Sequence, residues 1–231
     1  MDKDGAELIV SWFVDVEQRL AGLLTTVPYS PNTKDVFVPP LSGIILEACS
    51  LLDVVFREQM VPKQPKANIC DFRKFYEKEF SLSAKGTLFY RHPVVILRPF
   101  QCWGDPTATS DSPPWWKNYN ALKHNRVESY SLSTLETAVE AVCAIHQAIS
   151  AFPIFYEAMK RHGFLHGRSD VDWKLREVFC REVYYADIPE VMVETALFGT
   201  PCVRPLPESV DKIEWETYRG GPTFRRHFTA Q

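Results

Sequence analysis

The sequence is short of glycine and lacks the motifs that cradle nucleotide phosphates. Only 10 of its 231 residues are glycine, below the roughly 7% average of proteins. Neither G-x-G-x-x-G nor G-x-x-x-x-G-K-[ST] occurs, and these patterns bind phosphates through closely approaching backbone. The sequence therefore excludes dinucleotide-binding and P-loop chemistry, and any phosphate has to be bound by side chains or helix ends.

Paired cysteines and common catalytic motifs are also missing. The six cysteines stand at positions 49, 70, 102, 143, 180 and 202, so no C-x-x-C pair exists. Zinc ribbons and thiol redox motifs are thereby excluded. The motifs H-E-x-x-H and G-x-S-x-G do not occur either. We expect no metal and no cofactor, and we expect Cys49 and Cys143 to be buried in apolar helices.

The chain begins with the acidic segment MDKDGAELIV, which has no basic leader and no small-residue cleavage site. No uncharged apolar run approaches the ~18 residues that a membrane span needs. A hydrophobic content of 45% and a charged content of 24% are ordinary for a globular protein. These features predict a cytoplasmic protein with no membrane contact.

The net charge of -3 is unevenly distributed. Residues 85–126 contain six basic and two acidic residues and carry +4, which leaves -7 for the rest of the chain. This asymmetry indicates either a basic patch on an acidic protein or a chance cluster on a solvated face. We expect the first helix to present a solvated acidic face formed by Asp2, Asp4, Asp15 and Glu17.

Apolar periodicity predicts a mainly helical α+β protein. Helices are expected over 6–25, 40–60, 68–80, 115–124 and 133–150, the last one opened by a Ser133-x-x-Glu136 capping box. Residues 87–90 and 94–97 predict a β-hairpin, and further strands are expected at 191–197 and 213–218. We divide the chain into a helical core over 1–152, with a hairpin and loop insertion at 81–112, and an α/β appendage over 153–231. The appendage strands are expected to join the hairpin in one small sheet.

The segment WWKNYNALKHNR, residues 115–126, carries the strongest functional signal. On a helix, Lys117, Asn120 and His124 share one face. Tyr119, Lys123 and Arg126 share the neighbouring face, and no carboxylate lies between them. Cations balance phosphate charge and an imidazole transfers protons near neutral pH.

Two aromatic residues precede this face, Trp115 and Trp116. They are candidates to stack on bases. In the alternative interpretation, Trp115, Trp116 and Tyr119 are core anchors of an amphipathic helix. His124 then lies at the helix C-terminus, where a cation is favoured in any case.

This short helix, with its polar N-x-x-[KR]-H pattern leading into a long final helix, resembles the HEPN superfamily of helical domains. The resemblance covers roughly residues 6–152 in helix order and is specific only at 117–126. The family histidine corresponds to His124, and the polar position to Asn118 or Asn120. Lys117 stands where the family has arginine, and Arg126 follows the histidine instead of preceding it. The segment PPWWKNYNALKHNR also resembles segments of helical bacterial proteins of no assigned function.

The resemblance implies a metal-independent endoribonuclease from a prokaryotic defence, toxin or mobile-element system. Two protomers of such enzymes place their motifs in one cleft, where the RNA 2′-OH attacks the adjacent phosphate and leaves a cyclic phosphate. His124 would act as acid or base, with Lys117, Asn120 and Arg126 beside it. RNA would further contact Lys123, Tyr119, Trp115 and Trp116. Many members instead lack nuclease activity and serve as interaction modules, so a non-catalytic dimerisation or docking module is the alternative.

A second candidate, RHGFLH at 161–166, also matches arginine, a polar residue and then histidine after four intervening residues. Its members are Arg161 and His166. The alternative is a basic helix C-terminus ended by Gly163. A metal cluster of His162, His166, Asp170 and Asp172 requires the helix to continue through that glycine, which is unfavourable.

Overall fold

The structure is a computed structural model and describes residues 1–90, 94–105, 112–167 and 191–202. Its six helices are α1 (Lys3–Thr26), α2 (Pro39–Gln59), α3 (Ile69–Phe80), α4 (Pro114–His124), α5 (Leu135–Ala151) and α6 (Tyr156–Arg161). Its five strands are β1 (Thr87–Phe89), β2 (Val95–Leu97), β3 (Leu165–Gly167), β4 (Val191–Glu194) and β5 (Phe198–Cys202). The described part is therefore a mainly helical α+β fold, as predicted.

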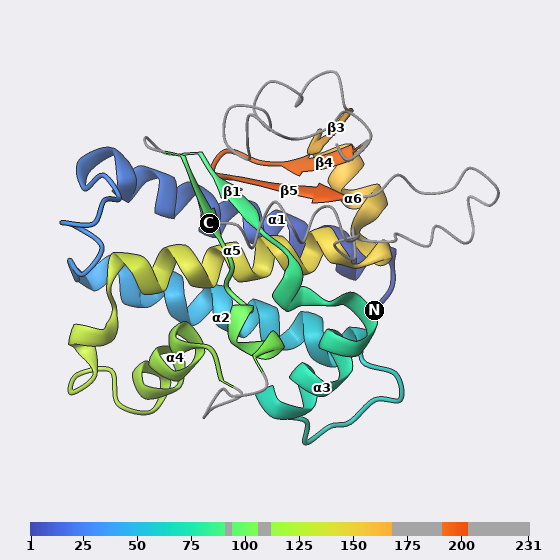
Figure 1. Ribbon diagram of the computed structural model, residues 1–231, viewed down its shortest axis with the longest axis horizontal. Coiled ribbons are helices and arrows are strands. Elements are labelled where there is room, and N and C mark those ends of the chain that lie inside the picture. Colours follow the sequence, from blue (N-terminus) through green and yellow to red (C-terminus); the bar gives the residue numbers. More distant parts are fainter. Residues whose placement is uncertain (91–93, 106–111, 168–190, 203–231) are drawn as a thin grey trace.

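The helical core is built around α5, which lies between α1 and α2 (Figure 1). Every residue of α5 from Ala141 to Ala151 is buried, because the helix is apolar on all sides and other elements cover it. α1 and α2 bury one apolar face each. Cys49 and Cys143 lie buried in this core as free thiols, which confirms their predicted environment.

α2 is long and apolar enough to cross a membrane by length and composition, and so is the bent pair formed by α5 and the segment Pro153–Arg161. In the fold both segments contribute to the protein core. α2 packs against α1, α4 and α5, and it begins with two prolines in its first turn. Proline is favoured there because the first helical N–H groups have no acceptor within the helix.

A five-stranded antiparallel sheet lies beside the helices, with the order β2-β1-β5-β4-β3. The predicted hairpin is confirmed, since Leu88 of β1 faces Ile96 of β2. Leu88 also faces Gly199 of β5, so the later strands do join the hairpin in one sheet, as predicted. The strand expected at 191–197 divides into β4, a turn and β5, whereas the strand expected at 213–218 lies outside the described residues.

The structure corrects two local expectations. The N-cap of α5 is Thr134, whose hydroxyl accepts a hydrogen bond from the Thr137 amide at 3.2 Å, whereas Ser133 donates its hydroxyl to the Tyr130 carbonyl. Glu17 is buried instead of solvated. Its carboxylate accepts hydrogen bonds from the Thr195 hydroxyl and the Leu197 amide in the β4–β5 turn. Glu17 of α1 thus binds the β4–β5 hairpin. Helical periodicity reports only local burial, so it could not predict this long-range contact.

Candidate functional site

Helix α4 is fixed on the core through its aromatic face. Trp115, Trp116 and Tyr119 are only 1%, 6% and 4% exposed. The Trp115 indole N–H donates to the Pro99 carbonyl at 2.8 Å, and the two indole rings meet edge to face with centroids 5.7 Å apart. Buried rings offer no face to a nucleobase. The predicted stacking role of Trp115 and Trp116 is therefore wrong in this fold, and burial of all three rings agrees with the core-anchor interpretation.

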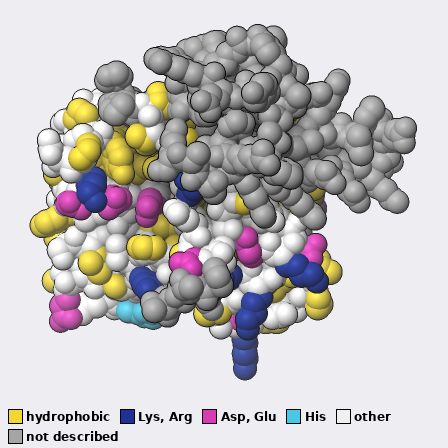
Figure 2. Space-filling view, viewed as in Figure 1, with side chains coloured by type: hydrophobic (Ala, Val, Ile, Leu, Met, Phe, Trp, Pro, Cys, Tyr) yellow, Lys and Arg dark blue, Asp and Glu magenta, His cyan; other side chains and the backbone are white. Residues whose placement is uncertain are grey.

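The opposite face of α4 is basic and open to solvent. Lys117, Lys123, His124 and Arg126 are all exposed, and within the described ranges none of them forms an ion pair. The Lys123 ammonium lies over the Tyr119 ring, 5.4 Å from its centroid. In Figure 2 a histidine and a basic side chain lie near the lower left edge, over α4, whereas acidic side chains gather higher, over the start of α5. This face can attract an anion.

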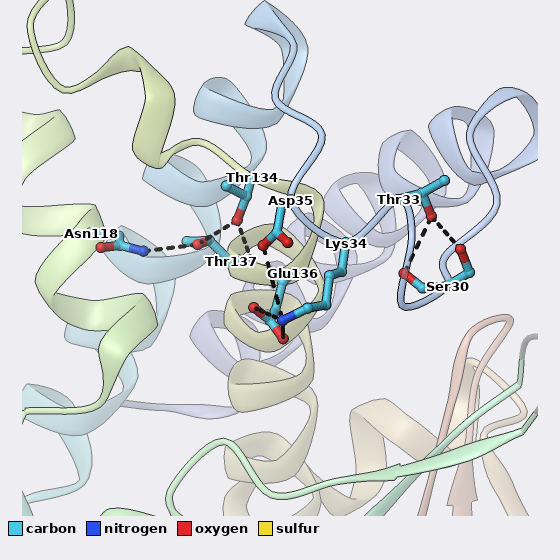
Figure 3. A network of polar contacts seen from close by, with 8 residues as sticks. All are labelled: Ser30, Thr33, Lys34, Asp35, Asn118, Thr134, Glu136 and Thr137. Carbon is cyan, nitrogen blue, oxygen red and sulfur yellow. Dashed lines mark hydrogen bonds and ion pairs between the residues drawn. The ribbon is translucent and has the colours of Figure 1, made fainter.

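The two asparagines of α4 have different surroundings. The Asn118 amide donates to the Thr137 hydroxyl at 2.9 Å, and that hydroxyl lies 3.0 Å from the Thr134 hydroxyl. Figure 3 shows this chain of contacts joining α4 to the N-terminus of α5. Asn118 therefore fixes the orientation of α4, while Asn120 lies half-buried one turn before His124. Of the two candidates for the polar position, Asn120 remains beside the histidine.

The spacing along α4 separates the proposed catalytic residues. Lys117 and His124 are seven residues apart, which is about 10 Å along a helix axis. Lys123 and His124 instead lie in the last turn of the helix, where the helix dipole favours positive charge, and Arg126 follows the C-cap residue Asn125. These three basic residues are therefore close together along the chain, whereas Lys117 lies about two turns earlier.

The second candidate site is not assembled by the fold. Arg161 donates two hydrogen bonds to Glu7 of α1, at 2.6 and 3.0 Å, and its hydrogen bond holds the pKa of that carboxyl below its usual range. His162 lies 3.1 Å from the same carboxylate. His166 belongs to strand β3 and faces Met192 of β4 across the ladder.

These contacts neutralise Arg161 and separate it from His166, so the pair forms no catalytic unit. Asp170 and Asp172 lie outside the described residues. Across the described ranges, no three His, Cys, Asp or Glu side chains are grouped so that they could hold a metal ion.

Sequence reasoning missed a buried polar seam between α5 and the sheet. The His146 imidazole Nδ1 lies 3.0 Å from the Thr200 hydroxyl of β5, which lies 2.8 Å from the Thr87 hydroxyl of β1. The Gln147 amide donates to Thr87 at 3.4 Å. Burial lowers the pKa of His146 to about 3, and its Nε2 atom has no hydrogen-bond partner among the described residues. His146 lies on the apolar stripe of α5, so periodicity alone indicates only a core position.

Sequence reasoning also missed Glu140 of α5. Burial, together with the charge of Glu136 one turn earlier, raises the pKa of the Glu140 carboxyl to about 7. Glu136 itself pairs with Lys34 at 3.3 Å (Figure 3). A carboxyl that titrates near neutral pH marks the region between α4 and the α1–α2 linker as electrostatically unusual.

Comparisons of the chain with protein-family models, with curated proteins and with solved structures find no match. The likeness to the HEPN superfamily therefore rests on residues 115–126 and on the helix order.

Proposed function

We propose that the chain is a HEPN-like protein that binds RNA through the basic face of α4 and cleaves it without a metal. The observation that carries the proposal is the open cluster of Lys123, His124 and Arg126, which has no carboxylate partner among the described residues. Lysine and arginine bind phosphate through charge, and arginine does so bidentately. An exposed imidazole beside them supplies a group that transfers protons near neutral pH.

In the proposed reaction the RNA 2′-OH attacks the adjacent phosphorus, the bond to the 5′-oxygen breaks, and a cyclic phosphate and a 5′-hydroxyl form. His124 removes the 2′-OH proton or protonates the leaving oxygen. Lys123 and Arg126 stabilise the additional negative charge of the transition state. Because each chain supplies one such histidine, a homodimer that faces two α4 helices would supply both proton transfers.

The test of this proposal uses the purified protein, a mixed RNA pool and an excess of chelator. We expect the wild type to release fragments with cyclic phosphate ends and His124→Ala to lower the rate by roughly 10²- to 10⁴-fold, the usual contribution of a general acid or base. His162→Ala is the matched control, because it removes a histidine held by Glu7 on α1. Equal cleavage by wild type and His124→Ala, or no cleavage by either, contradicts the nuclease proposal.

A non-catalytic interaction module is the second candidate, and a different surface favours it. Leu8 and Trp12 of α1 and Val54 of α2 are exposed apolar residues. Trp12 and Val54 line a pocket together with Glu47, Ser50 and Leu51. We propose a second copy of the chain as the occupant of this pocket; this homodimer would form through α1 and α2, and not through the α4 helices that the nuclease proposal brings together. Sedimentation of Trp12→Ala beside the wild type tests it, and an unchanged oligomeric state contradicts it.

The resemblance to the HEPN superfamily also supports a proposal for the biological setting of this chain. HEPN-like proteins belong to prokaryotic defence, toxin and mobile-element systems, which would place this chain in the cytoplasm beside a protein partner of such a system.

A further inference from the structure

The burial of the tryptophans leaves the basic face of α4 without the aromatic contacts that unpaired RNA uses. Phe37 and Tyr130 form a different aromatic pair, and the short turn that contains Tyr130 contacts α4. Phe37, in the linker between α1 and α2, is 46% exposed. Its ring meets the half-buried ring of Tyr130 edge to face, with centroids 5.3 Å apart and planes at 87°. The pair therefore presents an aromatic surface to solvent.

The position of Phe37 is fixed by backbone contacts. Phe37 forms a β-bridge with Thr134, the N-cap of α5. The Leu135 amide donates to the Val36 carbonyl at 2.9 Å, and the Glu136 amide donates to the Lys34 carbonyl at 2.9 Å. Figure 3 shows the same linker held to α5 by the Lys34–Glu136 ion pair. The ring is therefore presented from a constrained segment, so binding does not require the segment to become ordered first.

A compact turn connects this aromatic pair to the cations of α4. The Ser129 amide donates to the Asn125 carbonyl at 3.0 Å, and the Glu128 amide donates to the Asn125 side chain at 3.3 Å. These bonds fold the chain between Arg126 and Tyr130 into one turn. Helix α4 also contacts the short 3₁₀ turn Tyr130–Leu132. The aromatic pair and the basic helix end thus belong to one continuous surface.

The charge differs between the two sides of this surface, and this difference predicts how an RNA strand would be oriented on it. On the α5 side of Phe37, Lys34 is neutralised by Glu136 and lies 4.0 Å from Asp35, so that side carries excess negative charge and repels phosphate. On the α4 side, the exposed cations Lys123 and Arg126 form no ion pair among the described residues, and they outnumber Glu128, the exposed carboxylate of the connecting turn. A strand bound here places its phosphates toward α4 and its base over Phe37.

We infer that Phe37 and Tyr130 form a stacking platform for an unpaired nucleobase of the RNA strand whose phosphates bind Lys123 and Arg126. This inference rests on the proposed function and names its substrate class as single-stranded RNA. Every base has a π-face, so a platform of this kind tolerates any base but requires one that is free of a duplex.

The test measures fluorescence anisotropy with three labelled or competing probes: a 12-nucleotide oligouridine, a blunt RNA duplex and inorganic polyphosphate. Wild type is expected to bind oligouridine more tightly than the duplex. Phe37→Ala should weaken oligouridine binding roughly 5- to 100-fold, the range for loss of one stacked base, and should leave polyphosphate binding unchanged. Phe37→Leu keeps an apolar side chain without the ring and should behave like Phe37→Ala.

Val61→Ala is the matched control, because Val61 is an exposed apolar residue that follows α2 at the opposite end of that helix from Phe37. It should bind all probes as the wild type does, and circular dichroism should show Phe37→Ala to be folded. Arg126→Ala should weaken oligouridine and polyphosphate equally.

The possible failures are distinguishable. If Arg126→Ala weakens oligouridine binding and Phe37→Ala does not, the platform is wrong while RNA binding stands. If Phe37→Ala weakens oligouridine and polyphosphate binding equally, the ring only supports the local packing and the platform is wrong. If Phe37→Ala alters self-association and leaves RNA affinity intact, the pair is a protein contact and the platform is wrong. Binding of no probe by the wild type contradicts the proposed function itself.

Discussion

Two histidines of this chain have opposite surroundings. His124 is exposed at the C-terminus of α4, among cations and without an ion-pair partner in the described ranges. His146 is fully buried on α5, between the rings of Phe13 and Phe198, and contacts Thr200. Burial lowers the pKa of the second imidazole and keeps it neutral, whereas the first imidazole is open to solvent and to a bound anion. The difference shows that the surroundings, and not the residue type, decide whether a histidine can do proton chemistry.

The two faces of α4 test the contrast between buried and exposed positions within one helix, and the largest effect is expected there. Trp115→Ala removes a fully buried ring and the donor to Pro99. We expect it to lower the free energy of unfolding by about 3–5 kcal/mol. Lys117→Ala, on the exposed face of the same helix, should change it by no more than about 0.5 kcal/mol. Urea denaturation measures both, and a stable Trp115→Ala that loses RNA affinity would reverse the assignment of the two faces.

The buried histidine should make stability fall in acid. The unfolded chain protonates His146 near its usual pKa of about 6.5, but the folded protein accepts that proton only near pH 3. Between these values the unfolded state binds more protons, so stability decreases as the pH falls. From pH 7 to pH 4.5 the wild type should lose about 3 kcal/mol more than His146→Asn, by the conversion of pKa shifts to free energy.

His124→Asn is the control for that experiment, because it replaces an exposed imidazole. It should keep the acid sensitivity of the wild type. The burial argument fails if His146→Asn and the wild type lose stability in parallel as the pH is lowered.

Glu140 should have the opposite and smaller pH dependence. Its folded pKa of about 7 lies above that of an unfolded glutamate, so its stabilising contribution is present at low pH and is lost as the pH rises toward 7 and beyond. Glu140→Gln should therefore stabilise the protein at pH 8 by about 2 kcal/mol and have little effect at pH 4.5.

Thermal unfolding at the two pH values measures the effect of Glu140→Gln. Glu128→Gln is the matched control, because that carboxylate is exposed and does not contribute to the raised pKa of Glu140. A pH-independent gain for Glu140→Gln would show that its carboxyl is not held protonated by the fold.

The sequence foretold the helices and the hairpin well, because apolar spacing reports which face of an element is buried. It also marked α4 as a special helix from the cluster of Lys117, Lys123 and His124. It failed where one residue serves a distant element. Glu17 sits at a position that reads as solvated, yet the β4–β5 turn, 178 residues later, binds its carboxylate. The sequence around Phe37 does not predict where its ring lies, because that position is set by the β-bridge to the distant residue Thr134.

The sequence by itself determined the α+β character, the helix order and the basic character of residues 115–126, since these follow from local composition and periodicity. The tertiary structure alone decided which side of each polar or aromatic residue meets solvent. It buried Trp115 and Trp116, neutralised Arg161 with Glu7 and left the Phe37 ring open to solvent beside Tyr130. Exposure and pairing depend on contacts between segments far apart in the chain, and those contacts exist only once the helices and the sheet have packed.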